Sequence, residues 1–105
     1  MNIKSLAREN EIVQLLSDLV AIESVNPAYR GGQRGEVAVG EYVAAYLRQL
    51  GIEPEFQAAL PGRPNVLGQL RGAREAALIF EAHMDTVTLD PMPDALTPKI
   101  RDGRL

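Results

Sequence analysis

The sequence contains no cysteine, and its 105 residues include only one histidine. The lack of cysteine excludes a disulfide scaffold, a thiolate metal site and a cysteine nucleophile, and it fits a reducing compartment. Aromatic residues make up only 5% of the chain, and the lysines and arginines are scattered through a protein of net charge −3. With no basic face in the sequence, the composition argues against nucleic-acid binding.

Long hydrophobic runs are also missing from the sequence. No stretch approaches the roughly eighteen consecutive apolar residues of a membrane-spanning helix, so no membrane association is expected. Residues 1–10 lack the apolar segment of a secretory signal. We therefore expect a soluble, cytoplasmic protein. The length suits a single domain, 1–105, with a hydrophobic core.

Two segments have the apolar spacing of amphipathic helices. Across residues 10–23 the apolar side chains recur at helical intervals, and Asn10 or Ser5 is a candidate N-cap. A second helix is expected to begin near residues 35–36. It is expected to close at Gly51, because glycine accepts the left-handed conformation that often follows the last helical turn.

The residues after the second helix change to strand patterns. Alternating residues 52–57 predict an edge strand, residues 65–72 a second strand, and the apolar run from about residue 76 to His83 a third strand that is covered on both faces. The expected fold class is α/β, with two amphipathic helices packed on a mixed sheet. Residues 86–105 contain three prolines and no clear period, so we expect an irregular tail there.

The third predicted strand ends in "AHMDTV", in which Asp85 follows His83 by two positions. Residues two apart in a strand point to the same face, and open α/β sheets bind ligands at the carboxyl ends of their strands. A neutral imidazole is a good zinc ligand, and its orientation is commonly fixed by a carboxylate. One interpretation is therefore a metal ligand with its orienting partner. The other is a histidine that caps a loop beside an aspartate that accepts backbone hydrogen bonds.

This region resembles the zinc-dependent family of aminoacylases, acetylornithine deacetylases, succinyl-diaminopimelate desuccinylases and carboxypeptidase G. The resemblance runs from about residue 9 onward and includes "VAIESVNP", "LRQLGIE", "PNVLGQLRG" and "DGRL". Its most specific part is the His-x-Asp-Thr-Val segment. Ala82 stands where the family often has glycine. Glu81 stands where small or apolar residues are common, and we assign it no catalytic role.

The resemblance implies that the chain is the N-terminal portion of a zinc-peptidase-like catalytic domain. His83 would bind one of two zinc ions, with cobalt or manganese as alternatives, and Asp85 would be the catalytic-site carboxylate that orients the imidazole. The enzyme would cleave the amide bond of N-acyl amino acids or small peptides, using a metal-bound water and a glutamate base. A homodimeric full-length form is compatible with the family.

The same resemblance places the other metal ligands and the general base downstream of the "RDGRL" segment. The chain as given is therefore expected to be an incomplete catalytic domain without activity of its own, because a catalytic zinc needs three protein ligands. The alternative function is a non-catalytic α/β module that binds a protein partner.

Overall fold

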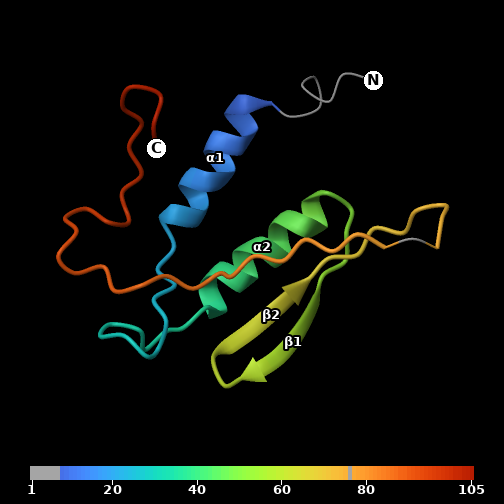
Figure 1. The fold of residues 1–105 in the computed structure, drawn as a ribbon, viewed down its shortest axis with the longest axis horizontal. Coiled ribbons are helices and arrows are strands. Elements are labelled where there is room, and N and C mark those ends of the chain that lie inside the picture. Colours follow the sequence, from blue (N-terminus) through green and yellow to red (C-terminus); the bar gives the residue numbers. More distant parts are fainter. Residues whose placement is uncertain (1–7, 76) are drawn as a thin grey trace. The chain divides into compact units, whose positions relative to one another are not determined.

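The structure is a computed structural model that describes residues 8–75 and 77–105 (Figure 1). The chain divides into two compact units: one contains Ser24–Thr88, and the other joins the residues up to Glu23 with Leu89–Leu105. Within the described parts of both units, no helix is long and apolar enough to cross a lipid bilayer.

Helix α1 spans Glu9–Val20, close to the segment predicted from its apolar spacing. Arg8 occupies the N-cap, so Asn10 lies inside the helix, while the other candidate, Ser5, falls outside the described residues. Glu9 and Glu11 lie in the first turn, where negative charge interacts favourably with the helix dipole. The helix ends at Val20, three residues before the predicted end at residue 23. The other unit begins at Ser24.

Helix α2 spans Val37–Gln49 and ends as the sequence predicts. Gly51 has φ +76°, and its N–H donates to the Arg48 carbonyl at 2.9 Å. The N–H of Ile52 donates to the Leu47 carbonyl, also at 2.9 Å. These two bonds form a Schellman motif, which satisfies carbonyls that the last helical turn leaves free.

Strands β1 (Glu55–Leu60) and β2 (Arg63–Leu67) form an antiparallel hairpin beside α2 (Figure 1). Both strands are displaced from the predicted ranges 52–57 and 65–72, because the chain turns at residues 61–62. Helix α2 packs on β2, and Gly40 lies on the side of the helix that faces the hairpin. A Cβ atom at this position would already lie 3.4 Å from the Val66 side chain. The helix side of this small core contains the buried residues Val39 and Ala44.

The α/β fold class is confirmed, but the third predicted strand does not form within the described residues. Residues 77–83 adopt no regular secondary structure, and the sheet is a two-stranded antiparallel sheet, not a mixed one. Leu78, Ile79 and Phe80 are 79%, 85% and 90% exposed. A strand that is apolar on both faces needs neighbouring strands and covering layers, and the described part of the chain provides neither for this segment.

Residues 89–105 contain turns but no helix or strand. Arg101 and Arg104 exchange backbone hydrogen bonds of 2.9 and 3.0 Å around a tight turn. Lys99 forms an exposed ion pair with Asp94 at 2.9 Å. Local hydrogen bonds of this kind give the segment its shape.

Candidate metal-ligand site

The candidate site lies where two distant parts of the Ser24–Thr88 unit meet. The Thr86 N–H donates to the Ser24 carbonyl at 2.9 Å, and the Asn26 N–H donates to the Thr86 carbonyl at 2.9 Å. These bonds form an isolated parallel bridge between Val25, which is buried, and Thr86. The bridge places Asn26 directly beside Asp85.

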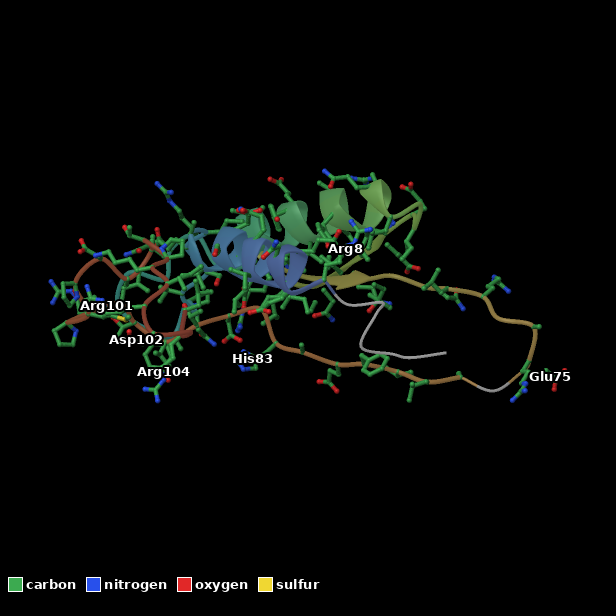
Figure 2. The ribbon with its side chains drawn as sticks, turned by 90° about the horizontal axis from the view of Figure 1, so that it is seen from above. Arg8, Glu75, His83, Arg101, Asp102 and Arg104 are labelled. Atoms are coloured by element: carbon green, nitrogen blue, oxygen red, sulfur yellow. The ribbon has the colours of Figure 1, made fainter. Side chains whose placement is uncertain are left out.

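The structure brings His83 and Asp85 into contact, as predicted, although the strand on which the prediction rests does not form within the described residues. Nδ1 of His83 lies 3.1 Å from Oδ1 of Asp85 and 2.9 Å from its backbone oxygen. Both oxygens are acceptors, so these partners assign the proton to Nδ1 and leave Nε2 with a free lone pair. The His83 side chain is 86% exposed and projects from the segment that follows the apolar run (Figure 2).

The carboxylate of Asp85 is held from the side opposite the imidazole. Asn26 Nδ2 donates to Asp85 Oδ2 at 2.6 Å, and Arg63 Nη2 lies 3.6 Å from the same oxygen. The hydrogen bond from Asn26, followed by that from His83, lowers the pKa of Asp85 below its ordinary value, although partial burial opposes this shift. Asp85 is therefore an ionised acceptor at neutral pH.

The side-chain amide of Asn26 is fixed in orientation by its own backbone. Its Oδ1 accepts a hydrogen bond from the Ala28 N–H at 2.8 Å, so Nδ2 is the atom that faces Asp85. Gly32 packs against the same turn. A Cβ atom at Gly32 would come within 2.6 Å of the Asn26 carbonyl carbon and 2.8 Å of Pro27 Cα. This turn therefore has no room for a side chain at position 32.

Arg63 is held beside Asp85 by Glu36, the N-cap residue of α2. Arg63 Nε donates to both Glu36 carboxylate oxygens at 3.0 and 3.1 Å, and Nη2 donates to Oε1 at 2.6 Å. The Glu36 side chain is only 7% exposed. Its hydrogen bond and charge raise the pKa of Arg63 above the usual value, with a smaller contribution from Asp85. Arg63 thus remains a cation shared by two carboxylates.

Sequence reasoning identified His83 and Asp85 but missed the three residues behind them. Asn26, which precedes Pro27, reads as part of the chain's exit from the first predicted helix, Glu36 as an acid favourable to the helix dipole, and Arg63 as a surface residue near a turn. The contacts that join them span 59 positions from Asn26 to Asp85 and 27 from Glu36 to Arg63. No local pattern carries information about such pairs.

The described residues fit one ligand of a metal site and not a complete set. His83 offers an exposed Nε2 whose ring is already oriented, which suits a zinc ligand. Among the residues that the structure describes, no group of three or more His, Asp or Glu side chains is placed to share a metal ion. A catalytic zinc requires three protein ligands, so this part of the chain does not form such a centre by itself.

A hollow of about 660 Å³ lies in the same unit, along α2 and the hairpin, and Arg63 is one of its lining residues. Its lining is mostly apolar, and His83 and Asp85 are not part of it. The candidate chemistry is therefore on an open surface and not inside this hollow.

Comparison with known proteins gives two informative similarities. The chain is 30% identical over 80 residues to N-formyl-4-amino-5-aminomethyl-2-methylpyrimidine deformylase of Bacillus subtilis, an alignment that covers 73% of this chain and 18% of the deformylase. It is 29% identical over 111 residues to an uncharacterized metallohydrolase of Methanocaldococcus jannaschii, covering 90% of this chain and 26% of that protein.

No family model matches the chain, and no solved structure matches it. The chain spans between about a fifth and a quarter of the length of the two curated relatives described. The names of both relatives support a relationship to hydrolases. The name of the second relative also supports a relationship to metal-dependent hydrolases. The chain is thus similar to part of a metallohydrolase.

Proposed function

We propose that this chain supplies His83 as a metal ligand to a metal-dependent amidohydrolase that cleaves N-acyl amino acids or small peptides. The observation that carries the proposal is the contact between His83 Nδ1 and Asp85, at 3.1 Å to the carboxylate and 2.9 Å to the backbone oxygen. It leaves Nε2 unprotonated and exposed, which is the state that a metal ligand requires.

Each residue of the pair has a separate role in this proposal. His83 Nε2 would hold zinc, with cobalt or manganese as alternatives. Asp85 does not bind the metal; its carboxylate orients the ring and increases the basicity of Nε2 through the hydrogen bond to Nδ1. When bound, the metal supplies Lewis acidity and lowers the pKa of a water molecule.

The proposed substrate class is supported by the name of one relative and by the resemblance of the sequence motif. The name of the Bacillus subtilis relative describes removal of an N-formyl group, which is the smallest N-acyl group. The sequence motif resembles enzymes that hydrolyse N-acyl amino acids and small peptides. In this proposal residues 1–105 are the N-terminal portion of one catalytic domain, and the remaining ligands and the general base are supplied by further sequence.

The test begins with the intact mass of the polypeptide that the native gene expresses. That polypeptide is then assayed with zinc against N-formyl, N-acetyl and N-succinyl amino acids. We expect His83→Ala to lower kcat/KM by about 10²-fold or more, because a metal ligand is lost. We expect Asp85→Asn to lower kcat/KM by about 10- to 100-fold, which is the usual effect of changing a residue that orients a metal ligand. Asn65→Ala, on the exposed face of the hairpin, is the control. Unchanged activity in His83→Ala would overturn the proposal.

The isolated 105-residue chain is the second part of the test. We expect no amide hydrolysis with added zinc, since one histidine does not make a catalytic centre. Turnover by this chain that His83→Ala abolishes would show that its own residues complete the site, and it would overturn the placement of the other ligands in further sequence.

The alternative function is a non-catalytic module that binds a protein partner. The observation that favours it is the exposure of Leu78, Ile79 and Phe80 on a segment without strand pairing in the described structure. Exposed apolar segments commonly mark interaction surfaces. A native product of 105 residues that binds no zinc at His83 would support this function over the enzyme.

A further inference from the structure

We propose that Asn26, Arg63 and Glu36 form a clamp that positions the Asp85 carboxylate and thereby fixes the tautomer of His83. We call these three residues the Asp85 clamp. The inference rests on the proposed function only for the metal that His83 would bind, because the tautomer is a property of the chain without metal. The clamp residues touch neither metal nor substrate in this scheme, so they are positioning residues.

The two carboxylate oxygens of Asp85 have different partners. Oδ2 accepts the 2.6 Å hydrogen bond from Asn26 and faces Arg63 Nη2 at 3.6 Å. Oδ1 faces the His83 ring at 3.1 Å. Since Oδ2 is held by one hydrogen bond and one ion pair, the carboxylate cannot rotate without breaking those contacts. Oδ1 is therefore directed at Nδ1.

The clamp residues are themselves held in place by hydrogen bonds. Asn26 is fixed by the bond from the Ala28 N–H at 2.8 Å and by the backbone bond to Thr86 at 2.9 Å. Arg63 is fixed by its paired hydrogen bonds to the buried Glu36 carboxylate. A guanidinium bound in this forked way has little rotational freedom.

The exposed His83 ring, when neutral, can carry its proton on either nitrogen. Free neutral histidine favours the tautomer with the proton on Nε2, and an exposed side chain such as His83 would follow that preference without local partners. Here both partners of Nδ1 are acceptors that belong to Asp85. The clamp thus acts through Asp85 to keep the proton on Nδ1 and Nε2 free.

The chain offers a clean measurement, because His83 is its only histidine. Ring nitrogen shifts from two-bond 1H–15N correlation spectra, recorded at a pH where the ring is neutral and at a concentration where the chain is monomeric, give the tautomer fractions. We expect wild type to have mainly the Nδ1-protonated form.

Two variants remove the clamp by different routes. Asn26→Asp keeps an acceptor for the Ala28 N–H and replaces the donor to Asp85 with a repelling carboxylate; Asn65→Asp adds the same charge on the hairpin as a control. Glu36→Met/Arg63→Met removes both partners together, so no buried charge is left unpaired; Arg71→Met, at an exposed arginine, is its control. Backbone amide spectra establish that each variant is folded.

Both clamp variants are expected to shift the ring toward the Nε2-protonated form, with the controls unchanged. A wild-type ring that is mainly Nε2-protonated, or folded clamp variants with the wild-type tautomer, would overturn the inference. The activity of the polypeptide that the native gene expresses separates the clamp from the proposed function. A clamp-dependent tautomer together with unchanged activity in His83→Ala keeps the clamp and removes the metal role. Loss of that activity together with a clamp-independent tautomer keeps the metal role and removes the clamp.

Discussion

Asn26 and Asp85 are 59 positions apart in the sequence and are joined by a hydrogen bond of 2.6 Å from Nδ2 to Oδ2. This bond ties the loop after α1 to the segment that carries the candidate ligand. The turn that presents Asn26 also requires glycine at position 32, since it leaves no space there for a side chain.

Gly32→Ala is expected to destabilise the protein by about 1–3 kcal/mol, because the new methyl group overlaps backbone atoms of Asn26 and Pro27. The measurement is the free energy of unfolding in urea. Gly72→Ala is the matched control, since a Cβ atom there meets nothing within 4 Å. Equal stability of the two variants would show that the turn has more room than the structure indicates.

Asn26→Ala is expected to raise the pKa of Asp85, because Asn26 is the largest cause of its lowered value. A carboxyl group whose pKa is lowered by folding stabilises the folded state above its unfolded pKa, and this contribution is lost as the pH falls through the folded value. Hence wild type should retain its stability to lower pH than Asn26→Ala. The 13C shift of the Asp85 carboxyl group, followed from neutral to acid pH, measures the pKa of Asp85 in wild type and in Asn26→Ala. Identical titrations would contradict the assigned role of Asn26.

Gly40→Ala and Gly51→Ala are expected to change stability in opposite directions. A Cβ atom at Gly40 would make ordinary contacts of 3.4–3.8 Å, so alanine should gain about 0.5–1 kcal/mol from its higher helix propensity. Gly51 has φ +76°, where alanine is strained, and we expect a loss of about 1 kcal/mol. Urea unfolding of both variants tests the packing of α2 on the hairpin. A loss of stability in Gly40→Ala as large as that in Gly51→Ala would contradict this packing.

Phe80→Lys is expected to reduce self-association of the isolated chain. Leu78, Ile79 and Phe80 form a highly exposed apolar run without strand pairing in the part of the chain described, and such segments pair with other chains. Sedimentation velocity over a range of concentrations should show wild-type oligomers that decrease in the variant. Leu50→Lys, at the exposed end of α2, is the control. A wild-type chain that stays monomeric throughout would contradict the prediction.

Features that depend on neighbouring residues could be predicted from the sequence. The end of α2 at Gly51 follows from the conformational preference of a single residue, and the contact between His83 and Asp85 follows from a separation of two positions. The prediction of a third strand is wrong for the described residues, because the pairing of Leu78, Ile79 and Phe80 depends on partners that the local sequence does not reveal. The same holds for Arg63, whose role depends on a glutamate 27 positions away.

The parallel bridge between Val25 and Thr86 has a consequence for the order of folding. Helix α2 and its hairpin are joined by short connections, whereas the bridge closes a loop of several dozen residues, and closing a longer loop has a larger entropic cost. The bridge should therefore form after the local elements and open before them. Amide hydrogen exchange at Asn26 and Thr86 should accordingly be faster than in the middle of α2, so the contact that orients the candidate ligand is expected to open more often than the helix of the same unit.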